Sequence, residues 1–238
     1  MFWVFCSIFL TGFTGHEWID QANFPDYESC KKEIFFKTTI PVQVECSYPI
    51  FRGRGTLTDV VNLQIKTEAE GRFASFCKEG ISEDDLGEDA CLLSYDLVPV
   101  YQTPHLISIF GCIFQGRGSH GCSYYEGLTF WQIGESVVKL GLDELFVKGS
   151  GYRQFLLHYC ENEFKASGYG YYSSRPELPP ELGPSDLDIF VLTDKGLRII
   201  FRAYTVGGWA DGPDSVLIPY AKLKEFIDIF GPLKELAN

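Results

Sequence analysis

The residues most typical of a functional site lie near the C-terminal end of the chain, and their types indicate binding of a partner. Trp209 is flanked by Gly207, Gly208 and Gly212, and Asp211 stands close beside it. Glycine lets the backbone turn sharply, and an indole ring offers a large contact area at a small entropic cost, as at interface hot spots. The sequence therefore predicts a binding loop. The alternative is that Trp209 folds back over the core.

A histidine and two cysteines in the middle of the chain offer the parts of a nucleophile. His120 lies close before Cys122, and Cys112 would face them across a predicted hairpin. A thiol beside a histidine base can attack an electrophilic carbon. A histidine in a glycine-rich turn commonly serves as a hydrogen-bonded turn residue, so the sequence favours a structural role for His120.

Motifs of other catalytic or cofactor chemistry are missing from the sequence. It has no phosphate-cradling loop, no paired acids at helical spacing and no Ser-His-Asp order. The acidic segment 82–89 offers oxygen ligands for calcium, but its carboxylates lack the alternating spacing of an EF-hand loop. We therefore predict no catalytic residue, no metal site and no cofactor, and a solvated loop at 82–89.

A tyrosine-rich segment, residues 167–184, is expected to form a long surface loop. Tyr171 and Tyr172 give it the composition of a surface that contacts carbohydrate or peptide, and His120 is a further candidate for this second surface. The alternative is a loop whose tyrosines pack on the protein's own sheet.

Regular elements must position these residues. Val61, Ile65, Ala69 and Phe73 recur at helical spacing and predict an amphipathic helix over residues 57–78. A second helix is expected over 152–164. Strands are expected at 33–48 (with a break at Pro41), 91–101, 106–114 and 128–133.

The C-terminal region reads as a hairpin, a loop, a strand and a closing helix. The hairpin pairs residues 188–192 with 197–206 through a tight turn at 194–196, and a strand follows at 216–220. The closing helix would bury Leu223, Phe226, Ile227 and Phe230. The predicted fold class is α+β, an antiparallel sheet with two or three helices packed on one face.

Size and charge narrow the function classes. The chain has 238 residues, with 45% hydrophobic and 16% aromatic content, which excludes a disordered protein. Its formal net charge of −12 argues against nucleic acid or an anionic membrane as a partner, because both require a basic face. The charge suits a cationic partner, although acidity can also serve solubility alone.

The first fifteen residues are apolar and uncharged, as in the core of a secretory signal. We predict a signal-like leader at 1–15, a strand-helix subdomain at 16–90 and an α+β subdomain at 91–238, with no stable membrane span after leader removal. The protein is then exported: periplasmic, secreted or associated with the cell envelope. Eight cysteines fit disulfides in such a compartment, with Cys112–Cys122 and Cys77–Cys91 as candidate pairs.

Four landmarks, in their order, give the chain a family resemblance. It resembles the extracytoplasmic domain shared by the lysozyme-sensing anti-sigma factor RsiV and the N-terminal part of the peptidoglycan deacetylase PdaC. The landmarks are Tyr48-Pro49 before the first helix; the turn Arg117-Gly118-Ser119-His120-Gly121; Gly134 leading to Val138, Leu140, Leu145 and Phe146; and Tyr204, Trp209, Gly212 and Ile218-Pro219-Tyr220.

The resemblance covers about residues 33–230 and implies an exported binding domain, not an enzyme, whose partner is a cationic muramidase such as lysozyme, or cell-wall glycan. Gly208-Trp209 stands where the family usually has proline-tyrosine. We predict partner contacts at the following residues: Trp209, Gly208, Asp211, Tyr204 and Tyr220. The alternatives are a hydrolase or deacetylase acting on envelope glycans, and a structural envelope protein without a ligand.

Overall fold

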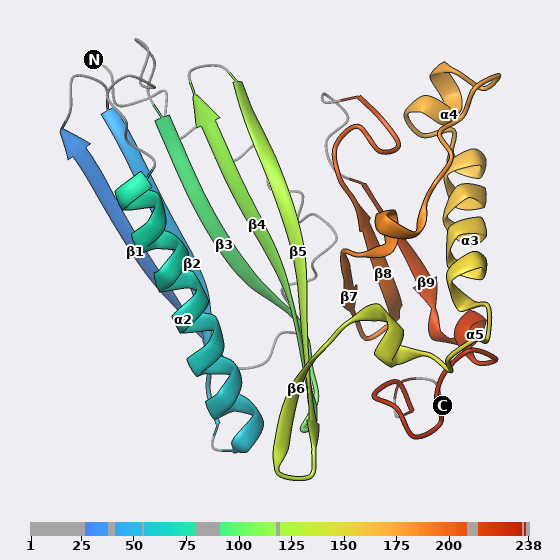
Figure 1. Cartoon of the computed structure of the whole chain (residues 1–238), viewed down its shortest axis with the longest axis horizontal. Coiled ribbons are helices and arrows are strands. Elements are labelled where there is room, and N and C mark those ends of the chain that lie inside the picture. Colours follow the sequence, from blue (N-terminus) through green and yellow to red (C-terminus); the bar gives the residue numbers. More distant parts are fainter. Residues whose placement is uncertain are drawn as a thin grey trace.

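In the part of the chain that this computed structural model describes, two β-sheets pack on each other and each carries a helix on its outer side (Figure 1). The structure describes residues 27–37, 41–53, 55–79, 91–117, 120–208, 214–234 and 236. The elements follow in this order: β1 (Tyr27–Lys37), β2 (Pro41–Phe51), α2 (Thr56–Glu79), β3 (Cys91–Gln102), β4 (Leu106–Arg117), β5 (His120–Ile133), β6 (Ser136–Leu140), η2 (Leu142–Leu145), α3 (Tyr152–Ser167), α4 (Tyr171–Ser174), η3 (Pro184–Leu187), β7 (Phe190–Leu192), β8 (Gly196–Phe201), β9 (Asp214–Pro219) and α5 (Tyr220–Leu223).

The large sheet has the strand order β1-β2-β3-β4-β5-β6. All neighbours are antiparallel except β2 and β3, which run parallel because α2 carries the chain from the end of β2 back to the start of β3. The predicted helical stripe is confirmed: Val61, Ile65 and Ala69 are at most 1% exposed and pack on one sheet face. This sheet crosses residue 90, so the two predicted subdomains share it.

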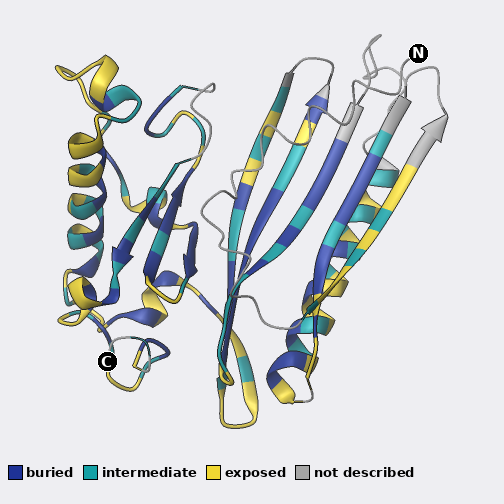
Figure 2. Cartoon of the chain, turned by 180° about the vertical axis from the view of Figure 1, so that it is seen from behind, coloured by how far each residue is buried: buried dark blue, intermediate teal, exposed yellow. Residues whose placement is uncertain are grey.

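The small sheet, β7-β8-β9, is antiparallel and packs between the large sheet and α3. Leu156, Cys160 and Phe164 follow each other at helical spacing, are all buried, and face the core that the small sheet lines. α3 ends at Gly168, whose φ of 62° permits the left-handed C-cap. β7 and β8 are mostly buried, whereas much of α3 is exposed (Figure 2).

The two sheets meet where β7 crosses β4 and β5. A Cβ atom added to Gly127 of β5 would lie 1.7 Å from the carbonyl oxygen of Phe190, so only glycine admits the β7 backbone at this point. Beside it the buried backbone N–H of Leu192 donates to Ser108 Oγ at 2.9 Å. Apolar side chains from both sheets fill the remaining space, among them Phe110, Tyr125, Ile189, Val191 and Ile200.

The α+β class and the packing of helices on sheets are therefore confirmed, with differences in detail. The structure has a small sheet in addition to the large one, and β6 continues the large sheet where no strand was predicted. The predicted closing helix is confirmed only in part: α5 ends at Leu223. Leu223 and Ile227 are buried as predicted, whereas Phe230 is 79% exposed. In the described residues, no helix is both long and apolar enough to cross a membrane.

The cysteines whose side chains are described are free thiols: Cys30, Cys46, Cys77, Cys112, Cys122 and Cys160. The register sets Cys112 opposite Tyr125 and Cys122 opposite Gln115, which places the two thiols on opposite faces of the sheet. Cys112 is buried and Cys122 exposed, so the predicted bridge between them is wrong. Cys77 is also a free thiol, and the side chain of Cys91 lies outside the description.

We expect Gly127→Ala to lower the free energy of unfolding by about 3 kcal/mol or more, because the added methyl group would overlap the Phe190 carbonyl. Urea unfolding followed by circular dichroism measures this. Gly71→Ala is the matched control: no atom lies within 4 Å of its added Cβ, and alanine should raise the stability of α2 by about 0.5 to 1 kcal/mol. Equal effects of the two substitutions would show that the sheet contact does not require glycine.

Candidate functional site

The predicted binding loop is described only at its two ends. Trp209 and Asp211 lie outside the described residues, whereas Gly208 before them is described and partly exposed. The chain is described again from Asp214, at the start of β9. The geometry of this region therefore comes from the turn that precedes Gly208 and from the strand that follows the loop.

Tyr204 occupies an unusual backbone position in that turn. Thr205 N donates to Arg202 O at 3.1 Å, which closes a tight turn with Tyr204 at its third position. Tyr204 has a φ of 70° and is the one non-glycine residue with positive φ among the described residues. Such a conformation costs a bulky L-residue about 1 kcal/mol or more. The residue gains little burial in return, since Tyr204 is 63% exposed.

The segment after Tyr204 is tied to the start of α4. Tyr171 N donates to Val206 O at 2.9 Å. Gly170, with a φ of 52°, packs so closely that an added Cβ would lie 2.3 Å from the same oxygen. Both segments lie at one end of the small sheet (Figure 1). Tyr171 and Tyr204, predicted on separate surfaces, thus belong to neighbouring segments.

Tyr171 keeps a partly exposed ring on this surface. The Arg175 guanidinium lies over it, 5.5 Å from the ring centroid. Cation and ring can both contact a partner while restricting each other's motion. We call Tyr171, Arg175, Tyr204 and Gly208 the tyrosine surface.

Two predicted contact residues are core anchors instead. Tyr220 is 6% exposed, and its hydroxyl donates to Thr193 O at 2.8 Å, which fastens the β7–β8 turn. Tyr172 is 7% exposed, and its hydroxyl donates to Pro180 O at 3.1 Å. Burial raises the pKa of Tyr172 to about 12 and raises the pKa of Tyr220 as well. The predictions that Tyr172 and Tyr220 contact a partner are therefore wrong, because their rings are inside.

The structure gives no support to a cysteine-histidine nucleophile. His120 begins β5 opposite Arg117, and its side chain lies outside the description. Cys112 lies on the sheet face that packs against β7–β9, and burial raises the pKa of its thiol to about 12. A thiol with so high a pKa stays protonated and is a poor nucleophile at neutral pH. Cys160 is likewise buried on the core side of α3.

The strand that follows the loop begins at partly buried hydrogen bonds. Arg198 Nη1 donates to Ser215 Oγ at 2.8 Å, and Ser215 N donates to Asp214 Oδ1 at 2.6 Å. Burial raises the pKa of Asp214, against the opposing effects of the Ser215 N–H and of Arg198. These hydrogen bonds and the pairing of β9 with β8 fix the end of the loop.

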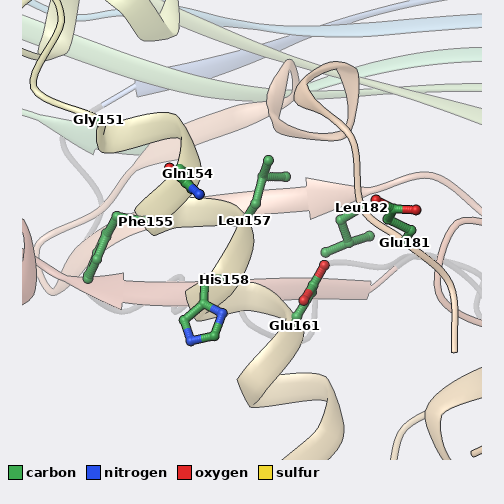
Figure 3. Close-up of a pocket in the computed structure, with 8 residues that line it drawn as sticks. All are labelled: Gly151, Gln154, Phe155, Leu157, His158, Glu161, Glu181 and Leu182. Carbon is green, nitrogen blue, oxygen red and sulfur yellow. The ribbon is translucent and has the colours of Figure 1, made fainter.

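A groove beside α3 is a further candidate site that the sequence did not predict. Its volume is about 480 Å³. It lies between one face of α3 and the segment that leads into η3 (Figure 3). The polar lining residues are Gln154, His158 and Glu161 from α3 and Glu181 from the facing segment; Leu157 and Leu182 are among the apolar ones. The signal in the sequence is the spacing of residues 154, 158 and 161, which places three polar side chains on one helix face.

Asp96 and Glu45 form a pair of neighbouring carboxyl groups on the large sheet, which we assign to the structure of the sheet and not to a site. Asp96 on β3 lies opposite Ser47 on β2. Two residues earlier on each strand, Ser94 lies opposite Glu45. Burial, and then the charge of Glu45, raise the pKa of Asp96 to about 6, while Lys31 opposes the shift. Lys31 Nζ lies 3.4 Å from Glu45 Oε2. No group of three or more His, Cys, Asp or Glu within the described ranges is arranged to hold a metal ion.

Comparisons with known proteins show the fold, and one segment of the chain matches a family model. Residues 143–221 match the family model described as a protein of unknown function, DUF3298. A crystal structure of a member of that family from Bacteroides fragilis is 14% identical, with a TM-score of 0.57, and the match covers 86% of this chain and 94% of the other. A family protein from Pseudomonas aeruginosa is also 14% identical, with a TM-score of 0.56, covering 87% and 95%.

These likenesses show the fold alone, because the sequence identities are low. No curated protein matches the chain. The segment that matches the DUF3298 family contains α3, α4 and the small sheet, and with them both the tyrosine surface and the groove.

Asp96→Asn is expected to remove a pH dependence of stability. Burial raises the pKa of Asp96 in the folded protein from 3.8 to about 6. The protonated carboxyl therefore contributes to the free energy of unfolding fully below pH 4, and this contribution is lost as the pH rises through 6. The difference in free energy of unfolding, variant minus wild type, should therefore grow by about 2 to 3 kcal/mol between pH 4 and pH 7. Urea unfolding at several pH values measures it. A difference that stays constant would contradict the burial of a protonatable Asp96.

Proposed function

We propose that this protein is an exported binding domain of the cell envelope, and that it recognises a cationic muramidase such as lysozyme. The contact would be made by the tyrosine surface and by the adjoining loop with Trp209. The proposal places the chain among binding proteins and assigns it no catalytic residue.

The observation that carries the proposal is the conformation of Tyr204. A tyrosine held at positive φ, with most of its surface in solvent, costs folding energy and returns little packing energy. Such strain is found at sites where function requires the geometry. Exposed tyrosine and arginine are also the residue types that concentrate binding energy at protein interfaces.

The rigidity of the surroundings supports the same reading. The Tyr204 turn is joined to α4 by the hydrogen bond from Tyr171 to Val206, and α4 is anchored by the buried ring of Tyr172. A surface held in its bound conformation loses little entropy on association. Gly207 and Gly208 then allow the chain to leave this support and enter the loop with Trp209.

Charge supports a basic partner. A net charge of −12 attracts a cationic protein over distances of about 10 Å, and salt weakens the attraction. Lysozyme-type muramidases are the cationic partners to which the resemblance to the RsiV and PdaC domain points. Export is supported by the apolar, uncharged residues 1–15.

Binding of a basic lysozyme to the purified protein tests the proposal. We expect a complex in isothermal titration calorimetry whose affinity falls as ionic strength rises from about 0.02 to about 0.15 M, because the steering charges are screened. Absence of binding at both ionic strengths would remove the muramidase proposal. Hydrolysis of peptidoglycan that disappears in His120→Ala would replace it by the hydrolase alternative.

Tyr204→Gly should separate binding from stability. Glycine adopts a φ of 70° without strain, so the free energy of unfolding should not fall, whereas loss of the ring should weaken lysozyme binding by about 2 kcal/mol. Calorimetry of binding and urea unfolding measure the two quantities. Tyr124→Gly is a comparison variant, because Tyr124 is 54% exposed on the large sheet, away from the tyrosine surface. Equal loss of affinity in both variants would contradict a local role for Tyr204.

A further inference from the structure

The groove beside α3 holds polar groups that the described part of the protein leaves unused. Gln154, His158 and Glu181 line it with side chains exposed to solvent, and within the described residues none of the three makes a hydrogen bond or an ion pair with the protein. Their combined capacity is mostly that of acceptors: a carboxylate, an amide oxygen and an imidazole nitrogen. A ligand that matches them must bring several donors.

The charge of the groove is negative. Glu161 reaches from α3 toward Leu182 and Glu181 on the facing segment (Figure 3). Lys165 Nζ lies 3.5 Å from Glu161 Oε2, one turn further along the helix, and is not among the lining residues. No lysine or arginine of the described chain lines the groove. Two carboxylates facing one space favour a cation between them.

The apolar part of the lining suits a long stem behind a charged head. Leu182 is 5% exposed, and Leu157 lies on the opposite wall. Arginine combines a hydrocarbon stem with a planar head of five donors that bind carboxylates in pairs. Lysine offers a point charge with three donors and is more strongly hydrated.

We propose that this groove receives an arginine side chain of the partner protein, with the guanidinium between Glu161 and Glu181 and the stem against Leu157 and Leu182. The inference rests on the proposed function in that it takes the partner to be a basic protein. It adds a second contact, in the groove beside α3, and assigns it to one side-chain chemistry.

The test uses tetra-arginine amide as the probe and the intact ¹⁵N-labelled protein. Wild type, Glu181→Gln and Glu177→Gln are titrated by nuclear magnetic resonance, and tetra-lysine amide is run in parallel. Glu177 is the matched control, because Pro176-Glu177-Leu178 repeats the local sequence Pro180-Glu181-Leu182 but Leu178 is 74% exposed and outside the groove. Circular dichroism checks that both variants fold.

We expect shifts confined to the amides of residues 154–161 and 181–182, and an apparent Kd that rises about fivefold in Glu181→Gln and stays unchanged in Glu177→Gln. Tetra-lysine should bind more weakly than tetra-arginine. Equal loss of affinity in the two variants, shifts elsewhere, or equal binding of the two peptides would overturn the inference. The probe is a peptide, so the two tests are independent. Failure of lysozyme to bind refutes the muramidase proposal but not arginine binding in the groove, and failure of tetra-arginine to bind refutes the groove inference but not the muramidase proposal.

Discussion

The close approach of the β7 backbone to Gly127 is the constraint on which the arrangement of this fold depends. A strand can cross a sheet at this distance only where the side chain is absent, and the nearby hydrogen bond from Leu192 N to Ser108 Oγ satisfies a buried donor of the crossing strand. Together they set the small sheet against β4 and β5. β8 and β9 are then placed by their pairing with β7 and with each other.

The small sheet in turn positions both candidate surfaces. Its outer face buries the stripe of α3 that includes Leu156 and Phe164, so the opposite, polar face of α3 is left to line the groove. The end of β8 leads into the Tyr204 turn, which α4 supports through Tyr171. The matched DUF3298 segment is therefore a structural unit in which two surfaces share one core.

Tyrosine plays two opposite roles in this unit, and burial separates them. Tyr172 and Tyr220 place their rings in the core and use the hydroxyl to hold a backbone carbonyl of a neighbouring turn. Tyr204 has its ring in solvent and accepts an unfavourable backbone conformation. The buried tyrosines hold the loops in place. The exposed, strained Tyr204 has no such structural role, and we therefore assign it to binding.

The sequence predicted the elements whose apolar periodicity is strong, and missed what depends on contacts between distant segments. The stripes of α2 and α3 and the β7–β8 hairpin follow from local spacing. The strand β6 carries Ser136 and Lys139 and is mostly exposed, so it gave no strand pattern.

Contacts between distant segments account for the remaining errors. The predicted bridge between Cys112 and Cys122 was wrong because the pairing register of β4 and β5 puts the two residues on opposite faces of the sheet. The burial of Tyr220 and the wall of the groove that residues 181–182 form were not predictable, because both require segments twenty or more residues apart to meet. Trp209 lies between the described residues Gly208 and Asp214, so its role stays a prediction from its sequence neighbours.

Hydrogen exchange of the backbone amides, measured with and without a basic lysozyme, tests the central claim most directly. The account predicts protection in residues 169–175 and 202–213, the segments that carry the tyrosine surface and the loop beyond it, with the outer face of α2 unaffected. Protection confined to α2 and the large sheet, with residues 202–213 unchanged, would contradict it.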